Sequence, residues 1–474
     1  MLLKRFYDDK LAQASYLIGC QATGEAIVVD PNRDVAFYVD AVAREGMTLR
    51  YVSETHIHAD YLSGARELAH RTGATLLLSG DGPEEWQYGF VEQSGARLLH
   101  DGDVVELGKI RIQVIHTPGH TPEHISFMIT DGAASDRPMG VLTGDFVFVG
   151  DVGRPDLLEK AAGVSGTMEE GARTLYRSLE RFRAQPDYLQ ILPGHGAGSA
   201  CGKALGAVPT STLGYEKLVN WAFQCATEEE FVEQVLEDQP EPPVYFAVMK
   251  RLNRDGPPML GPLPEPPRLD ATGLPALMEG GPTVVDLRDA ARFRAGHVPG
   301  TLSIPLNSSF PNWAGWLLPY DRPVYFVADH ADQAREAARD LALIGIDSSA
   351  GWFGPEALDG WADACGTVET TSEIPWDRAE EVAGEEDGVF VDVRRQTEWD
   401  EGHVAGARHV HLGYLGERAD ELPRDRPLLV YCRSGARSGM AVSLLQARGF
   451  THVHNVAGGI LERGRRGLPV TRES

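Results

Sequence analysis

The chain has 474 residues, of which 42% are hydrophobic and 24% are charged, a length and composition that favour about three globular domains. Its net charge of −25 argues against nucleic acid and anionic membranes as partners, because an acidic surface repels phosphate groups. No run approaches 18 apolar residues and the N-terminus lacks an apolar signal segment, so we expect a cytoplasmic protein. Five cysteines without a C-x-x-C pair favour free thiols over disulfides.

Residues 1–252 are expected to form the first domain. Apolar runs such as AIVVD and RIQVIHT are typical of strands, whereas LSGARELAHRTG and GARTLYRSLERFRA are typical of helices. Four polar motifs follow expected strands, namely THIHAD with His56, His58 and Asp60, TPGHT with His120, LTGD with Asp145, and LPGHG with His195. Loops at strand ends present side chains on a rigid scaffold. The pattern therefore indicates a metal site.

These motifs, together with Asp30 of AIVVDP, resemble the metallo-β-lactamase superfamily over nearly the whole first block. The resemblance implies an αββα sandwich. Dinuclear zinc members of that superfamily read H-x-H-x-D-H, and the last His helps to hold the second metal. Here that position is Tyr61, and a phenol, with a pKa of about 10, is a poor zinc ligand near neutral pH. We therefore expect one metal per chain.

Within the superfamily, THIHAD, TPGHT and GDVGRPD look most like the persulfide dioxygenases. That resemblance implies one Fe(II) held by His56, His120 and Asp145. Two imidazoles and a carboxylate with open positions are typical of non-haem iron oxygenases, although catalytic zinc, which also uses three protein ligands, stays an alternative. The remaining site residues are expected around these ligands or in the substrate pocket: His58, Asp60, Tyr61, Arg154, His195 and Cys201.

Two of these residues have alternative interpretations. Arg154 of GRPD either binds a substrate carboxylate or forms a salt bridge with Asp156. Cys201 either lines the pocket and carries sulfur or is a small buried cysteine beside glycines. The sequence leaves both questions open.

The second half of the chain contains an internal repeat. Residues 253–268 hold six prolines and are expected to form a stiff linker. Beyond them, VVDLRDAARFRAGHVPGT from Val284 matches FVDVRRQTEWDEGHVAGA from Phe390. Each copy continues with an apolar strand and a helical run, which favours a parallel α/β sheet in each. We expect one domain over 269–370 and another over 371–474.

The last domain contains the sharpest motif, RPLLVYCRSGARSGM. Cys432 follows an apolar strand and precedes a helix, where backbone N–H groups form a cradle for an anion. Arg433 and Arg437 add positive charge, and these surroundings favour the nucleophilic thiolate. The loop resembles that of the rhodanese sulfurtransferases and is shorter than that of the related phosphatases. The backbone of the remaining loop residues is expected to bind the anion: Ser434, Gly435, Ala436 and Ser438.

The first copy of the repeat lacks this chemistry. Ala328 takes the position of Cys432, in the loop DHADQA. The aspartates Asp329 and Asp332 would repel an anionic substrate. Residues 269–370 are therefore expected to form a catalytically inactive rhodanese-like domain.

The whole order resembles the persulfide dioxygenase–rhodanese fusion proteins. It implies oxidation of a low-molecular-weight thiol persulfide by O2 to sulfite, a role in sulfide detoxification, and transfer of sulfane sulfur by Cys432 between thiosulfate, persulfide and sulfite. The alternative enzyme is a zinc-dependent thioester hydrolase of the glyoxalase II type fused to a sulfurtransferase. A non-catalytic sulfur carrier is a third interpretation, and homo-oligomer formation is left open.

Overall fold

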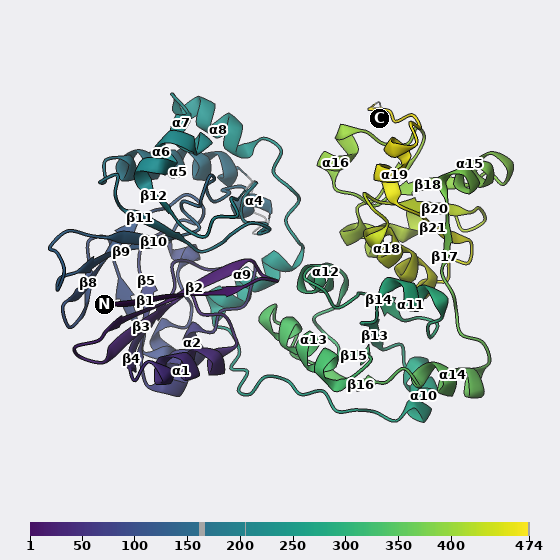
Figure 1. Ribbon diagram of the computed structural model, residues 1–474, viewed down its shortest axis with the longest axis horizontal. Coiled ribbons are helices and arrows are strands. Elements are labelled where there is room, and N and C mark those ends of the chain that lie inside the picture. Colours follow the sequence, from purple (N-terminus) through teal and green to yellow (C-terminus); the bar gives the residue numbers. More distant parts are fainter. Residues whose placement is uncertain (161–165, 204, 473–474) are drawn as a thin grey trace. The chain divides into compact units, whose positions relative to one another are not determined.

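The computed structural model describes residues 1–160, 166–203 and 205–472. The chain separates into two compact units, Met1–Leu263 with Ala342–Gly345 and Pro264–Leu341 with Ile346–Ser474 (Figure 1). Within the described residues, no helix has the length and apolar character needed to cross a membrane.

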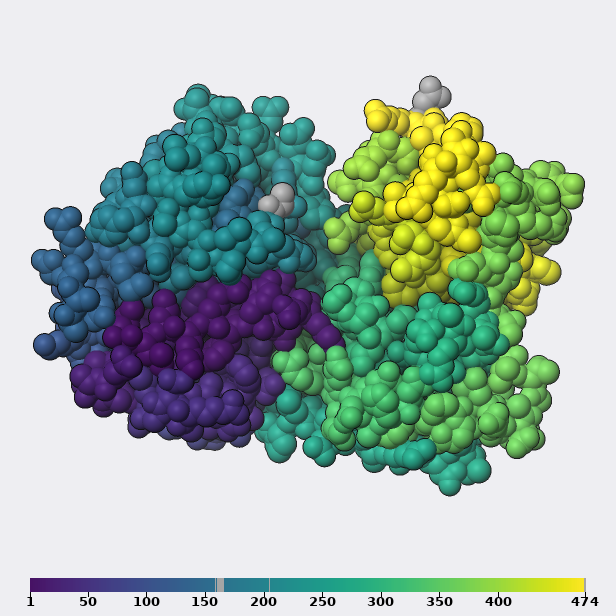
Figure 2. All heavy atoms as spheres, in the orientation of Figure 1, coloured from purple at the N-terminus to yellow at the C-terminus, as the bar shows by residue number. Residues whose placement is uncertain are grey.

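The first unit is built on two six-stranded sheets. The first sheet, in the order β1-β2-β3-β4-β5-β6, comprises β1 Leu2–Asp8, β2 Gln13–Cys20, β3 Glu25–Val29, β4 Thr48–Ser53, β5 Thr75–Ser79 and β6 Arg97–Leu99. The second, in the order β12-β11-β10-β9-β8-β7, comprises β7 Val104–Leu107, β8 Ile110–His116, β9 Ile125–Asp131, β10 Gly140–Gly144, β11 Gln190–Pro193 and β12 Ser211–Thr212. Edge strand β1 lies partly exposed on the surface of this unit (Figure 2).

Helices cover the outer faces of both sheets. They are α1 Val35–Arg44, α2 Ala65–Thr72, α3 Val91–Ser94, α4 Leu157–Lys160, α5 Thr167–Arg183, α6 Leu213–Val219, α7 Trp221–Gln224, α8 Glu228–Leu236 and α9 Tyr245–Asp255. Alternation along a strand explains the layers. In β3, Ile27 and Val29 enter the core between the sheets, whereas Val28 packs with α1 and α2. The outer face of the second sheet packs with α5 and α8. The expected αββα sandwich is confirmed.

The second unit contains two smaller sheets whose strand pairings are parallel. The first, in the order β14-β13-β15-β16, comprises β13 Thr283–Asp286, β14 Leu302–Ser303, β15 Val324–Val327 and β16 Ser349–Phe353. The second, in the order β17-β21-β20-β18-β19, comprises β17 Ser372–Ile374, β18 Val389–Asp392, β19 Arg408–His409, β20 Leu428–Tyr431 and β21 Val453–Val456. The helices are α10 Leu274–Glu279, α11 Ala290–Ala295, α12 Phe310–Leu317, α13 Ala331–Leu343, α14 Ala357–Cys365, α15 Trp376–Glu385, α16 Gln396–Glu401, α17 Leu415–Arg418, α18 Ala436–Ala447 and α19 Gly459–Arg465.

The matched residues of the repeat form the same contacts in both copies. The Arg288 guanidinium donates to Asp286 at 2.6 Å and to the Gly296 carbonyl at 3.0 Å. Arg394 does the same with Asp392 at 2.6 Å and with the Gly402 carbonyl at 2.7 Å. Each buried Asp–Arg pair thus connects the end of a strand, β13 or β18, to the glycine that follows the next helix, α11 or α16. The shared sequence pattern is thus a structural signature of the fold.

The Pro-rich segment is docked over its first half. Helix α9 extends to Asp255, three residues into the stretch 253–268. Beyond it, the Glu67 carboxylate on α2 accepts hydrogen bonds from the N–H groups of Leu260 at 2.7 Å and Gly261 at 2.8 Å. The domain boundaries at 252 and 268 stay predictions.

Candidate functional site

Loops that follow strands of both sheets in the first unit bring the three predicted metal ligands together. His56 follows β4, His120 follows β8 and Asp145 follows β10 directly. Oδ2 of Asp145 lies 3.6 Å from Nε2 of His120 and 3.9 Å from Nε2 of His56. The ligand atoms of all three residues lie within 4.8 Å of one another. These residues, which are 89 positions apart in the chain at most, thus form one buried group.

Hydrogen bonds fix the tautomer of both ligand histidines. Nδ1 of His120 donates to the Arg154 carbonyl at 3.0 Å. Nδ1 of His56 lies 3.0 Å from the hydroxyl of Thr55, which itself donates to Asp30 and therefore accepts from the imidazole. In both rings the proton is on Nδ1, so the Nε2 lone pair faces Asp145. Burial lowers the pKa of His120 to about 3 and that of His56 well below its usual value, which keeps both rings in the neutral, metal-binding form.

Asp145 is the clearest sign that this group binds a cation. Its side chain is fully buried, and among the described residues neither carboxylate oxygen accepts a hydrogen bond. Burial raises its pKa to about 6. Buried polar atoms are nearly always paired, and an isolated buried charge is costly. Two proton-free imidazole nitrogens facing an unsatisfied carboxylate fit one divalent metal ion with open positions.

A second buried group lies beside the first and consists of Asp60, His195 and Cys201. Nε2 of His195 is 3.2 Å from Asp60 and 3.5 Å from Asp145, while its Nδ1 donates to the Ala12 carbonyl at 3.0 Å. Burial alone would lower the pKa of His195, but the two carboxylates outweigh it and raise that pKa. His195 thus lies between the two carboxylates, beside the predicted ligand group. The sequence placed all three residues near the ligands but did not predict that they form a group.

His58 and Tyr61 both contact Asp30, and the His58 ring also lies 4.2 Å from the ring of His56, with its Nδ1 lacking a hydrogen-bond partner among the described residues. Nε2 of His58 lies 3.2 Å from Asp30, and Asp30 outweighs the effect of burial and raises the pKa of His58 to about 9. The Tyr61 hydroxyl donates to the Asp30 carbonyl at 3.4 Å, and its ring lies against His58. Burial raises the pKa of Tyr61 well above its usual value, so the phenol stays protonated and does not replace the missing histidine as a ligand.

Arg154 forms the salt bridge rather than an open substrate contact. Its guanidinium is fully buried and donates twice to Asp156, both times at 2.7 Å, and once to the Ala200 carbonyl at 3.1 Å. The donors that a substrate carboxylate would need are therefore engaged. Arg154 still supports the site, because its backbone carbonyl orients His120.

Replacing Asp156 by Ala is therefore expected to destabilise the first unit. Removing one partner of a buried ion pair costs about 3–5 kcal/mol, because the other charge stays buried without compensation. Urea unfolding measures the loss, and Asp255→Ala, which breaks the exposed Arg254–Asp255 pair, is the control and should cost less than about 1 kcal/mol. A raised KM for the substrate at unchanged stability would instead favour a substrate-binding role for Arg154.

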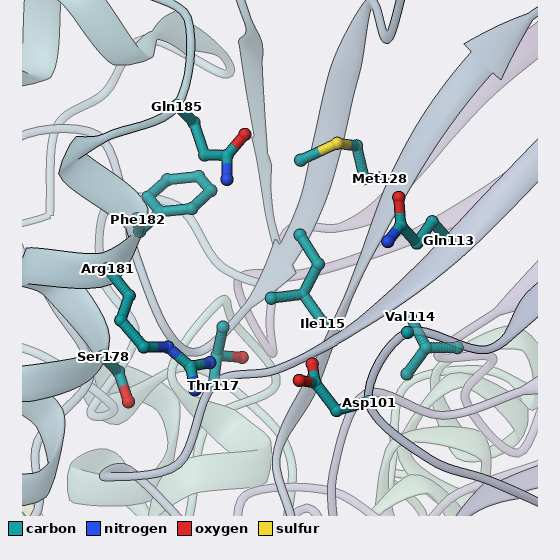
Figure 3. A pocket seen from close by; sticks show the side chains of 11 residues that line it. Asp101, Gln113, Val114, Ile115, Thr117, Met128, Ser178, Arg181, Phe182 and Gln185 are labelled. Atoms are coloured by element: carbon teal, nitrogen blue, oxygen red, sulfur yellow. The ribbon is translucent and has the colours of Figure 1, made fainter.

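Two pockets lie near the metal loops. One, of about 630 Å³, is lined by Trp86, by Thr167 and Glu170 of α5, and by Pro118, Gly119 and Pro122, which flank the ligand His120. The other, of about 230 Å³, lies between α5 and strands β8 and β9, where Arg181 and Asp101 point into the same space (Figure 3). Only the larger pocket is lined by residues next to a predicted metal ligand.

The cysteine loop lies at the carboxyl end of β20, as predicted. The sulfur of Cys432 accepts hydrogen bonds from the Gly435 N–H at 3.1 Å and from the Ser438 hydroxyl at 3.5 Å. Gly435 has φ +105°, a conformation that side chains other than glycine rarely adopt. A Cβ at Gly459 would lie 2.3 Å from the Cys432 carbonyl, which explains the NVAGGI motif. The loop therefore directs donors at the sulfur and would stabilise a thiolate.

Arg437 has a partner that the sequence did not reveal. Its guanidinium donates to both oxygens of Glu398, at 2.5 and 2.7 Å. Burial opposes ionisation of Glu398, but Arg437 outweighs it and holds the pKa of Glu398 below its usual range. Arg433 is exposed and forms no ion pair among the described residues. Arg433, rather than Arg437, is thus the uncompensated positive charge of the loop.

The loop of the inactive copy differs from the expectation in its charges. Asp329 pairs with Arg292 and Asp332 pairs with Arg335, so neither aspartate is an uncompensated negative charge. Two backbone N–H groups of this loop are already bonded to its own side chains. The N–H of Asp329 donates to Gln333 at 2.8 Å, and that of Gln333 donates to the His330 ring at 3.4 Å. The missing thiol and the two occupied N–H groups, rather than repulsion, are therefore the features that argue against anion binding by this loop. The inactivity of this domain stays a prediction.

Ala328→Cys is consequently expected to leave the middle domain without sulfurtransferase activity. The new thiol would lie in a loop whose N–H groups are taken up by Gln333 and His330, so neither a thiolate nor a leaving sulfite would be stabilised. The assay uses thiosulfate and a thiol acceptor in a Cys432→Ser background, with Cys432→Ser alone as the control. Robust turnover would show that the loop is a competent anion site.

Comparison with known proteins agrees with this architecture. The metallo-beta-lactamase superfamily matches residues 8–195, and the rhodanese-like domain matches residues 270–358 and 377–462. A solved metallo-beta-lactamase from Staphylococcus aureus subsp. aureus COL is 42% identical with a TM-score of 0.67, covering 75% of this chain and 99% of that one. Persulfide dioxygenase ETHE1, mitochondrial, of Mus musculus is 26% identical over 59% of this chain and 89% of its own length. A hydroxyacylglutathione hydrolase of Rhodopseudomonas palustris (strain BisA53) is 31% identical, over 41% of this chain and 67% of its own length.

The chain belongs to the metallo-β-lactamase superfamily and carries two rhodanese-like domains after its metallo-β-lactamase domain. This is the domain composition of the persulfide dioxygenase–rhodanese fusions, and the relatives named persulfide dioxygenase support that resemblance.

Proposed function

We propose that the chain oxidises a low-molecular-weight thiol persulfide to sulfite at one Fe(II) held by His56, His120 and Asp145, and that Cys432 transfers sulfane sulfur. The observation that carries the proposal is the buried Asp145 carboxylate, which accepts no hydrogen bond among the described residues and faces two proton-free imidazole nitrogens. The relatives named persulfide dioxygenase support the choice of reaction.

Residues of the first unit have separate roles in the proposed oxidation. Fe(II) held by His56, His120 and Asp145 would supply the redox chemistry by which O2 oxidises the terminal sulfur of the persulfide. Burial of the ligands keeps bulk water away, and the hydrogen bonds to Thr55 and to the Arg154 carbonyl hold the two imidazoles in orientation. His195, bridged between Asp60 and Asp145, is placed to hold a proton. Overall, one persulfide, one O2 and one water give one thiol, one sulfite dianion and two protons.

The last domain accounts for sulfur transfer. The Cys432 thiolate attacks the sulfane sulfur of thiosulfate, the S–S bond of thiosulfate breaks, and its electron pair leaves with sulfite. The cysteine persulfide that results then passes its terminal sulfur to an acceptor thiolate or back to sulfite. The Gly435 N–H and the Ser438 hydroxyl stabilise the sulfur anion, and exposed Arg433 attracts the anionic substrate.

A zinc-dependent thioester hydrolase is the second candidate, and the similarity to hydroxyacylglutathione hydrolases favours it. Tyr61 argues against it, because its hydroxyl is bonded to the Asp30 carbonyl where dinuclear zinc members have a ligand. The deciding assay supplies a thiol persulfide and O2, or a glutathione thioester, to the iron-loaded full-length protein. Sulfite formed in equal amount to the O2 consumed would support the proposal, whereas thioester hydrolysis without O2 uptake would overturn it.

The proposed location and partners follow from the free cysteines and from the proposed reactions. All five cysteines are free, which fits a reducing compartment, and we propose that the protein acts in the cytoplasm. The proposed partners are a thiol persulfide, O2, thiosulfate and sulfite. The pocket of about 630 Å³ beside the His120 loop is proposed to receive the organic part of the thiol.

A further inference from the structure

Helix α9 contains a buried asparagine whose side chain is directed at the metal-ligand loop. Asn253 is only 1% exposed and lies outside the residues 8–195 that match the superfamily. Its Nδ2 donates to the carbonyls of His58 and Tyr61, both at 2.8 Å. Its Oδ1 accepts from the N–H of Ser63 at 2.9 Å. One amide group thus binds three backbone groups within a six-residue stretch.

That stretch is held by side chains and loop contacts rather than by regular secondary structure. The chain from His56 to Leu62 belongs to no helix or strand, and every residue in it is buried. Carbonyl groups buried without a donor cost free energy, and water has poor access to replace a lost partner. Asn253, about 190 residues further along the chain, is therefore one of the supports of the loop that follows the ligand His56.

A buried glutamate also connects the two ligand loops. Glu123 accepts from the N–H of Ile57 at 2.8 Å and from the hydroxyl of Thr121 at 3.0 Å. Glu123 thereby ties the His56 loop to the His120 loop. Lys250 lies one turn before Asn253 on α9, and its ammonium group lies over the Trp86 ring at 3.4 Å.

We propose that α9 is a positioning element of the metal site, in which Asn253 holds the loop from His58 to Ser63 that follows the ligand His56. This inference rests on the metal group of the proposed function, but not on the reaction carried out there. It assigns a role to a helix next to the Pro-rich segment, far in sequence from every ligand.

The test measures Co²⁺ affinity and the visible ligand-field spectrum of full-length protein freed of metal. Asn253→Asp keeps the shape and the acceptor but loses both donors, and Asn253→Ala loses all three bonds. For each, we expect Co²⁺ affinity to fall about 10- to 100-fold, the usual effect of losing support behind metal ligands, together with a changed spectrum. Arg251→Ala, on the exposed side of the same helix, is the control and should match the wild type.

The outcomes separate this inference from the proposed function. If folded Asn253→Asp, or folded Asn253→Ala, binds Co²⁺ with wild-type affinity and spectrum, α9 is no positioning element. If the wild type itself binds no metal at this group, the proposed function fails as well. Weaker binding and an altered spectrum at unchanged circular dichroism would support the inference, because a loss of overall stability alone would not change the ligand field.

Discussion

Cys432→Ser is expected to lower thiosulfate sulfurtransferase turnover by on the order of 10³-fold or more, the scale on which enzymes lose rate when a nucleophile is removed. The loop would still direct the Gly435 N–H and the Ser438 hydroxyl at residue 432. A serine hydroxyl, however, is hardly ionised near neutral pH, and no base is available in the loop to activate it. Sulfite release from thiosulfate, followed with a thiol acceptor, measures the loss.

The same variant should keep persulfide-dependent O2 uptake close to the wild-type rate. Cys432 belongs to the second unit, whereas the predicted iron ligands belong to the first, and the two reactions use separate residues. Cys365→Ser, which replaces an exposed thiol in the second unit, is the matched control and should affect neither activity. Loss of O2 uptake in Cys432→Ser would mean that the two sites do not work as independent modules.

Asp145→Asn is expected to have the opposite effect, abolishing O2 uptake while preserving sulfurtransferase activity. The carboxylate is the only anionic member of the ligand group, and a neutral amide binds a divalent cation much more weakly. We expect metal affinity to fall by more than the roughly 10- to 100-fold that follows loss of a supporting contact. Metal content after dialysis and O2 uptake measure the effect.

Stability distinguishes a ligand from a structural aspartate at this position. In the metal-free protein, Asp145 is a buried carboxylate that accepts no hydrogen bond among the described residues, so replacing it by Asn should leave the metal-free protein at least as stable. Asp187→Asn, at an exposed position, is the control for both measurements. A metal-free Asp145→Asn protein that is strongly destabilised would indicate a structural role instead.

Local motifs were enough to predict that His56, His120 and Asp145 lie together and to predict the repeat. The role of these three residues as metal ligands stays a prediction. His56, His120 and Asp145 each follow a strand in a short motif, and strands deliver their loops to a shared edge of the sandwich, so the motif order alone brought the residues together. The repeated Asp, Arg and Gly positions predicted two related sheets because their contacts lie within ten residues of sequence. Both kinds of signal are short-range in the sequence.

Contacts between residues far apart in the sequence could not be predicted from the sequence. Glu398 binds Arg437 from 39 positions away, and Asn253 binds the His58 carbonyl from 195 positions away. A lone Glu or Asn in a polar helix carries no local pattern that reveals its partner. The charge of Asp329 was misjudged for the same reason, since its partner Arg292 lies on another element of the fold. The partner of Asp332, Arg335, lies only three residues away on the same helix.

Some residues had more than one possible partner in the sequence, and only the structure decided between the partners. GRPD allowed Arg154 either a substrate or Asp156 as its partner, and only burial of the whole guanidinium decided between them. The six prolines of 253–268 excluded a helix through that stretch, but did not reveal that Glu67 would anchor it.

The metal content of anaerobically purified full-length protein tests the central claim most directly. Elemental analysis should find one iron per chain, lost in Asp145→Asn, because His56, His120 and Asp145 form one group with open positions and Tyr61 supplies no further ligand. Zinc without iron, or two metals per chain with Asp145 shared between them, would contradict the account of this site as a mononuclear iron centre.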